Sequence, residues 1–378
     1  MLGVLAGQAL GFGLGLGSAA ARAAKKTVDK AASQSSGCVP RRTGTTGSVT
    51  LTAAPINPAS VVFATPVGNV NPPGHTFPTD HMYFYYVNPG ASGTPGVFDV
   101  YAPADGYISN VFSGVEQGAV QYKLTITHTD TFQTYLDHVM TLDASVAAAA
   151  TQSCPWIHVT AGQLIGTAGG VHGENAVDLG VINLQVSQPF INPGHYGISA
   201  NSDSPLKYYA GSLQTQLYSL VSRTQPDYLG NTEKDGIFCY DSPGTVAGNW
   251  AAQGSDSYWL NPDSWDQQLS FSYNAQYANE INVAFGGKNG SKTVKPSSGL
   301  GPWRVQSGAT PPQSLTVASG AYGYQLQYWD PNNGNFAGGT LGLLMVQLLD
   351  ASTLKVEYFD GDQNASEPFD SNAVIYTR

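Results

Sequence analysis

Histidine and aspartate side chains gather in three short stretches of the first half of the chain. Imidazole changes charge near neutral pH and so suits proton transfer, while imidazole nitrogens and carboxylate oxygens are both ligands of Zn²⁺. If the fold brings these stretches together, they could hold a metal ion or move protons. The residues concerned are His75, Asp80, His81, Asp137, His138 and Asp178.

Each of these residues also has a purely structural interpretation. His75 follows Pro72-Pro73-Gly74 and could order a turn. Asp137 and His138 could form a buried hydrogen-bonded pair, and the Asp178 carboxylate could accept backbone amides. The residue types alone leave both interpretations open.

The three cysteines, Cys38, Cys154 and Cys239, contain no Cys-x-x-Cys pair, so a thiolate zinc site is not expected. In an oxidising compartment Cys154 and Cys239 could pair and leave Cys38 over. The alternative is that they are buried thiols.

The composition bounds the fold and the partners. The 378 residues are enough for two or three domains, and only 11% are charged, against about a quarter in ordinary domains. Gly (44), Pro (23) and Tyr (21) are abundant, which favours many short strands joined by tight turns. A net charge of −10 gives no basic surface for nucleic acid, and an acidic, weakly charged surface is compatible with carbohydrate or peptide partners without requiring them.

The order of elements predicts a mainly β protein. We expect an antiparallel sheet or barrel-sandwich domain, then one amphipathic helix over 205–223, then a second β-rich barrel or sandwich domain. The Gly- and Pro-rich stretch 287–312 predicts a long mobile loop. Strands are predicted at 48–54, 82–87, 97–102, 106–112, 119–128, 132–139, 163–167, 177–186, 236–241, 244–251, 268–274, 279–285, 313–318, 322–328, 341–349, 353–359 and 372–377.

The domain boundaries follow from composition. Residues 1–24 form an apolar stretch similar to a secretory leader, and 25–47 form a polar linker. The two β-rich domains are predicted at 48–225 and 236–378. We therefore expect a secreted, extracellular or periplasmic protein that touches a membrane only if the leader stays uncleaved.

Four stretches occur in the order found in the lysostaphin-type zinc metallopeptidases, which this chain resembles over roughly residues 60–197. They contain a His…Asp stretch, a Val-x-Ala-Pro hairpin, an Ile-x-His…Thr-x-Tyr-x-His pair of strands, and a Gly-Gln-x-Ile-Gly turn. In this sequence they are Gly74-His75-Thr76-Phe77-Pro78-Thr79-Asp80-His81; Val100-Tyr101-Ala102-Pro103-Ala104-Asp105-Gly106-Tyr107-Ile108; Leu124-Thr125-Ile126-Thr127-His128 with Thr134-Tyr135-Leu136-Asp137-His138-Val139; and Val159-Thr160-Ala161-Gly162-Gln163-Leu164-Ile165-Gly166-Thr167-Ala168-Gly169.

The resemblance implies a zinc site and its ligands. Family members hold zinc through a His, an Asp and the second His of a His-x-His strand. Carried onto this chain, the metal ligands are His75, Asp80 or His81, and Asp178, and His138 takes the catalytic position of the Tyr-x-His strand. The implied cofactor is Zn²⁺, and the implied partner is peptidoglycan.

The sequence departs from the family pattern at the His-x-His strand. Ala176 stands where a proton-handling His is expected, and Asp178 stands where the ligand His is expected. Asp178 can still bind zinc, but Ala176 cannot carry a proton. Glu174 or His172 could substitute from the preceding Gly-rich loop. The sequence therefore predicts a degenerate site.

A second resemblance covers most of the chain, from about Ala64 to Arg378. The Pro72–Phe84 stretch, the Ala176–Gly180 strand and Pro243–Trp250 are similar to a group of bacterial secreted proteins with a peptidase-like domain followed by a C-terminal β domain. Gly248-Asn249-Trp250 also resembles the Gly-x-Trp start of lipocalin barrels.

Three functions remain open from the sequence. The first is a cell-envelope protein that binds peptidoglycan or another extracellular polymer through a degenerate metallopeptidase-like domain. The second is an active zinc endopeptidase with a rearranged site. The third is a non-catalytic β protein in which the C-terminal domain binds the ligand.

Overall fold

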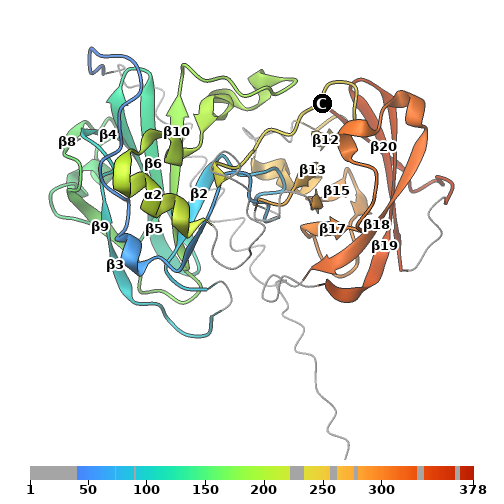
Figure 1. Ribbon diagram of the computed structural model, residues 1–378, viewed down its shortest axis with the longest axis horizontal. Coiled ribbons are helices and arrows are strands. Elements are labelled where there is room, and N and C mark those ends of the chain that lie inside the picture. The colour runs from blue at the N-terminus through green and yellow to red at the C-terminus, as the bar shows by residue number, and fades with distance from the viewer. Residues whose placement is uncertain are drawn as a thin grey trace, which may run out of the picture.

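The computed structural model describes residues 41–72, 74–88, 91–221, 234–255, 262–275, 280–329, 336–361 and 367–378. The predicted leader lies outside these residues, as do most of the predicted linker and of the predicted boundary at 225–236. Every pair of neighbouring strands is antiparallel, and two β-rich regions stand side by side (Figure 1). The prediction of a mainly β fold with two β-rich regions is confirmed.

An eight-stranded sheet forms the first region. The interior strand β10 has only buried residues, so both of its faces are covered. In spatial order the strands are β1 (Phe63–Thr65), β2 (His81–Tyr85), β10 (Ala176–Asn183), β6 (Phe132–Val139), β5 (Ala119–Thr129), β4 (Gly106–Glu116) and β8 (Ile157–Val159), and β11 (Ser202–Asp203) pairs with β10.

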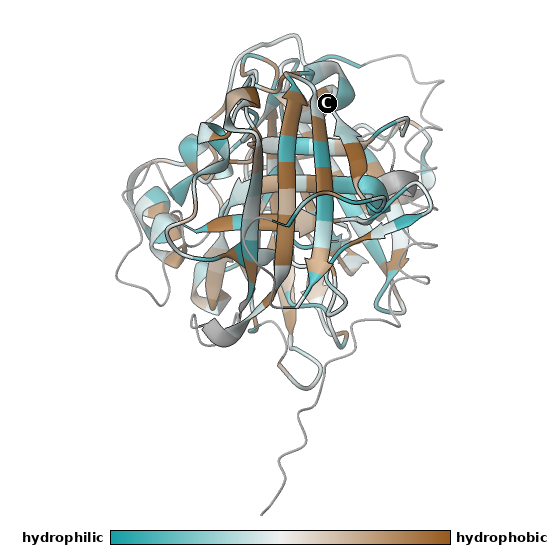
Figure 2. Cartoon of the chain, turned by 90° about the vertical axis from the view of Figure 1, so that its right-hand side faces the viewer, coloured by the Kyte–Doolittle hydropathy of each residue, from teal (hydrophilic) through white to brown (hydrophobic). Residues whose placement is uncertain are grey.

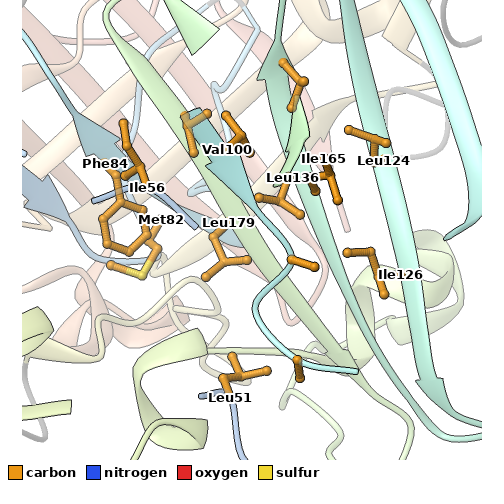
Figure 3. Packing of buried hydrophobic residues seen from close by; sticks show 14 of the residues in the cluster. Leu51, Ile56, Met82, Phe84, Val100, Leu124, Ile126, Leu136, Ile165 and Leu179 are labelled. Atoms are coloured by element: carbon orange, nitrogen blue, oxygen red, sulfur yellow. The ribbon is translucent and has the colours of Figure 1, made fainter. Parts of the chain in front are cut away.

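A smaller sheet and one helix cover one face of this large sheet. The smaller sheet runs β3 (Val97–Tyr101), β9 (Leu164–Gly169) and β7 (Thr141–Leu142), and the helix is α2 (Gly211–Leu220). Leu136 and Leu179 of the large sheet pack toward Val100 and Ile165 of the small one (Figure 3). Because side chains alternate along a strand, the residues between these core positions must point to the opposite face.

The second region is a closed eight-stranded barrel whose strands follow one another in chain order. Apolar and polar residues alternate along its strands, as Figure 2 shows from the barrel side. The strands are β12 (Gly248–Ala252), β13 (Gln268–Tyr273), β14 (Ile281–Phe285), β17 (Trp303–Val305), β18 (Ala321–Trp329), β19 (Phe336–Asp350), β20 (Thr353–Asp360) and β21 (Val374–Thr377); a separate hairpin joins β15 (Gly287–Asn289) to β16 (Lys292–Val294).

Trp250 and Arg378 fasten the two ends of this barrel together. Trp250 lies in the first barrel strand and is fully buried, and the Arg378 guanidinium carbon lies 4.1 Å from the centre of its ring. The same guanidinium donates hydrogen bonds to the carbonyls of Ala247 (2.7 Å), Thr245 (2.8 Å) and Ser242 (3.0 Å). The residue after the last strand thus stabilises the start of the first.

Several predicted elements differ in the structure. The helix predicted over 205–223 is split into a 3-10 turn at Pro205–Tyr208 and α2, whose first residue, Gly211, has a φ of 61° that is not helical. The stretches 48–54 and 236–241 form no strand, 313–318 forms two 3-10 turns, and the predicted loop 287–312 contains β15, β16 and β17. The 3-10 turns are η1 (Pro58–Ser60), η2 (Ala147–Thr151), η3 (Pro193–His195), η4 (Gly197–Asn201), η5 (Pro205–Tyr208), η6 (Pro262–Gln267), η7 (Pro312–Ser314) and η8 (Val317–Ser319).

The structure excludes the Cys154–Cys239 disulfide that the sequence left open. Cys154 is disulfide-bonded, whereas Cys239 is a buried free thiol, so these two do not pair with each other. Burial raises the pKa of the Cys239 thiol to about 12. Among the described residues, no helix combines the length and the apolar character that crossing a membrane requires.

Candidate functional site

The predicted site residues lie on the polar face of the large sheet, opposite the core. On β2, Met82 and Phe84 face the core, so His81 and Tyr83 face the other way. On β10 the register places Asp178 directly opposite Tyr83. Asp178 therefore sits on β10, an interior strand of the sheet, next to His81 and Tyr83 of β2.

A β-bulge in β6 brings His138 to the same face. Leu124 of β5 pairs with Leu136, and Tyr122 pairs with Val139, so β6 has one residue more than its partner between these pairs. His138 takes up the extra residue with a φ of 62°, a left-handed conformation that is unusual for a residue with a side chain. In a regular strand His138 would point away from Asp137. Here the bulge re-aims its ring toward Asp178.

Asp178 lies between two imidazoles. Its Oδ2 atom is 3.4 Å from Nε2 of His81 and 3.3 Å from Nε2 of His138. Its residue is only 3% exposed, and its other oxygen, Oδ1, is buried and makes no hydrogen bond with the described residues. Ala176 lies two residues earlier on the same face of β10, and its side chain is also buried and has no polar group.

The first imidazole is held from behind by Asp80. Nδ1 of His81 is 2.9 Å from Asp80 Oδ1, which also accepts a 2.7 Å hydrogen bond from the Tyr135 hydroxyl. The other oxygen of Asp80 accepts from Ser202 at 3.2 Å. Burial favours the neutral acid, but the hydrogen bond from His81 and its charge outweigh burial and hold the pKa of Asp80 well below its usual range.

The second imidazole is held from behind by an amide and two acids. Nδ1 of His138 donates to Gln121 Oε1 at 2.6 Å, and the Gln121 amide donates to Glu174. The carboxylates of Glu174 and Glu116 lie 3.6 and 3.7 Å from the same nitrogen. Although burial disfavours the imidazolium, the charge of Asp178 and its neighbours raises the pKa of His138 well above its usual value.

His75 lies at the margin of this cluster. Its ring meets the His81 ring edge-on, with 5.3 Å between the centroids. Its backbone exchanges hydrogen bonds with Asn71 at 2.8 and 3.0 Å. The residue thus closes a turn, as the structural interpretation of the Pro-Pro-Gly-His stretch proposed, and it also adjoins the site.

The structure therefore brings His81, His138 and Asp178 together. Asp80 does not face Asp178 but lies on the other side of the His81 ring. Both oxygens of Asp80 are engaged with His81, Tyr135 and Ser202. Across the part of the chain that the structure describes, no group of three or more His, Cys, Asp or Glu residues is arranged to hold a metal ion. As they stand, the predicted zinc ligands pair with one another.

Sequence reasoning missed Tyr135 and Gln121 as partners of the site, and it considered Glu174 only as a substitute for a missing residue. Tyr135 and Gln121 are neutral, so no charge pattern marks them. Glu174 comes from the Gly-rich loop and is 5% exposed, whereas His172 of the same loop is exposed and stays outside the cluster. His128 is separate too, since its ring bonds Asp105 O and Thr134 Oγ1, and burial lowers its pKa.

Comparison with known proteins adds little. No protein-family model matches the chain, and no curated protein matches it. Among solved structures, the chain is similar to the NMR solution structure of lysostaphin at 12% sequence identity and a TM-score of 0.25, over 77% of this chain and 97% of that one. At that score the likeness establishes neither a family nor a function for this chain.

Proposed function

We propose that the protein is a secreted or periplasmic cell-envelope protein whose large sheet binds peptidoglycan or another extracellular polymer without cleaving it. The observation that carries the proposal is the Asp178 carboxylate set between two imidazoles, with Ala176 beside it. The imidazoles that the resemblance would assign to zinc and to proton transfer are engaged with a carboxylate instead. Such a cluster supplies fixed donors and acceptors, which suits recognition better than hydrolysis.

The accessible part of the site lies on β4, β5 and β6. The side chains of His138, Glu116, Asp137 and Lys123 are 26, 30, 31 and 35% exposed, whereas that of Asp178 is 4% exposed. Toward the other edge of the sheet, the half-buried rings of Phe63 and Tyr85 stack with centroids 4.4 Å apart. Hydrogen-bonding groups next to aromatic rings are what a sugar or peptide polymer requires.

The test is sedimentation with insoluble peptidoglycan sacculi, with assays for released soluble fragments. We expect binding without fragments, weakened about tenfold by His138→Ala because charge-assisted hydrogen bonds are lost. His158→Ala, an exposed residue on the edge strand β8, is the matched control and should bind like wild type. Release of fragments, or equal binding by both variants, would contradict the proposal.

A second candidate is the rearranged zinc hydrolase. The observation in its favour is the buried Oδ1 atom of Asp178, which a cation would satisfy. When bound, zinc would activate a water molecule, but the donors do not form a metal site as they stand, so we derive no step through it.

Metal analysis of the purified chain separates the two candidates. Zinc at about one ion per chain, lost in both Asp178→Ala and His75→Ala, would favour the hydrolase. No metal after incubation with zinc would favour the non-catalytic binder.

A further inference from the structure

The loop that carries His75 and Asp80 lies between the large sheet and the barrel (Figure 1). We call residues 66–72 and 74–80 the site loop. Its two arms are bonded to each other, since the Gly68 amide donates to Thr79 O at 2.7 Å and the Thr79 amide donates to Asn69 O at 2.8 Å. The site loop is thus a closed unit whose position depends on what packs against it.

On one side the barrel strand β13 holds the loop. The Ser270 hydroxyl donates a 2.6 Å hydrogen bond to the carbonyl of Thr76, and both residues are fully buried. A Cβ atom added to Gly74 would lie 3.8 Å from the Trp265 ring, so the tip of the loop also contacts the segment just before β13. Without the Ser270 hydroxyl, the buried carbonyl of Thr76 would lose this hydrogen bond, which offsets the cost of removing the carbonyl from water.

On a second side the segment that leads into the barrel touches the loop backbone. Val67 and Gly236 form a β-bridge. A Cβ atom on Gly68 would lie 2.0 Å from Ile237 O, and one on Gly236 would lie 2.1 Å from Val67 O. The φ angles of these glycines are 91° and 76°, so both the space and the backbone conformation require glycine.

An apolar cluster seals this junction. It joins side chains of the site loop, of the 190–200 stretch and of the segment before the barrel; its members are Val67, Phe77, Phe190, Tyr196, Ala200, Phe238 and Cys239. The Tyr196 hydroxyl in turn accepts a hydrogen bond from Asn249 of β12 at 3.3 Å. The site loop, the 190–200 stretch and the segment that leads into the barrel therefore share a small apolar cluster, which Asn249 joins to the barrel through one hydrogen bond.

The junction connects directly to the candidate site. The loop ends at Asp80, which fixes Nδ1 of His81, and His81 faces Asp178. We propose that the barrel is a positioning element for this site, and that Ser270 is a positioning residue that acts through the site loop on His81. The barrel then fixes the geometry of the site and is not a separate ligand-binding domain.

The test compares Ser270→Ala with Ser272→Ala in the full chain. Ser272 is on the same strand, is 1% exposed, and its hydroxyl has no hydrogen-bond partner among the described residues, so it is a matched control. We expect Ser270→Ala to speed amide hydrogen exchange at Gly68, Asn71, His75 and Thr79 by about tenfold and to shift the His81 ring ¹⁵N resonances. Ser272→Ala should change neither, and Ser270→Thr, which keeps the hydroxyl, should restore both. Equal effects of the two alanine variants, or no effect of Ser270→Ala, would overturn the proposal.

A measurement on the unmodified chain decides the matter if Ser270→Ala does not fold. Under rising denaturant, the site-loop amides should exchange with the same free energy and denaturant dependence as the β13 amides of Leu269 and Phe271. Exchange of the site loop by an independent local opening, while β13 stays protected, would show that the barrel does not hold it.

Discussion

The two β-rich regions bury polar side chains in different ways. At the large sheet, the charged or titratable residues Asp80, His81, Glu174 and Asp178 are buried, and each is paired with another member of the site: Asp80 and Asp178 with His81, and Glu174 with His138. In the described barrel strands the buried polar residues are neutral except Glu357; they are Asn249, Gln268, Ser270, Ser272 and Asn282. Burying a charged group costs free energy unless it is paired, so the comparison agrees with the two proposals that the sheet holds the binding site and that the barrel positions it.

The largest loss of stability should come from a substitution in the apolar core of the barrel. Trp250→Ala removes a fully buried ring that also stacks under Arg378, and we expect a loss of about 4 kcal/mol in the free energy of unfolding, measured with urea. Trp156→Ala is the control in the other region, because this half-buried ring only stacks on Tyr107. Its loss should be about 1 kcal/mol, and similar losses for the two would remove the distinction.

The second prediction tests whether the buried charged cluster of the large sheet stabilises the fold. Asp178→Ala leaves the imidazoles of His81 and His138 without their shared carboxylate, and we expect destabilisation of about 3 kcal/mol in urea unfolding. Asp137 lies directly opposite Asp178 but is 31% exposed and pairs with Lys123. Asp137→Ala should therefore cost less than about 1 kcal/mol. The reverse order would contradict the importance of the buried cluster.

A smaller effect should follow from adding one methyl group beneath Tyr135. A Cβ atom on Gly180 would lie 2.1 Å from the Tyr135 ring, so Gly180→Ala must displace the ring that bonds Asp80. We expect a loss of about 2 kcal/mol in thermal or urea unfolding. Gly194→Ala meets nothing within 4 Å and should change stability by less than about 0.5 kcal/mol. A neutral Gly180→Ala would mean that Tyr135 moves freely.

The smallest effect is the pH dependence of stability that arises from His138. The folded pKa of His138 is raised, so the folded chain binds more protons than the unfolded chain between the ordinary histidine value and the raised one. Stability from His138 is therefore full below about pH 6.5 and declines as the pH rises through the folded pKa. Urea unfolding of chelator-treated protein at a series of pH values should show this decline, and His138→Gln should abolish it. An unchanged slope in that variant would assign the dependence to another group.

The sequence predicted where the strands of the site lie better than it predicted the face of the sheet to which their side chains point. The alternation in 132–139 located β6 with the bounds it has, but the bulge between Leu136 and Val139 depends on pairing with β5. No local signal distinguishes a bulged His138 from a regular one. For the same reason, the sequence could not decide between Asp80 and His81, because the register of β2 determines which of them meets Asp178.

Local composition misled where tertiary pairing decides. Gly, Lys and Pro between residues 287 and 312 indicated a loop, yet strand pairing with neighbours there stabilises β15, β16 and β17. Conversely, 236–241 has the composition of a strand but packs as irregular backbone against the site loop, where Gly236 must meet Val67. The zinc assignment stays a prediction, because it rested on residue types whose partners only the fold reveals.

Cys239 gives this junction a chemical reporter of its own. The thiol is 8% exposed, belongs to the apolar cluster between the two regions, and has its pKa raised to about 12, so a bulky maleimide should not reach a reactive thiolate while the regions are joined. The rate at which maleimide labels the Cys239 sulfur would then report how often the sheet and the barrel separate, and no cysteine has to be introduced for the purpose.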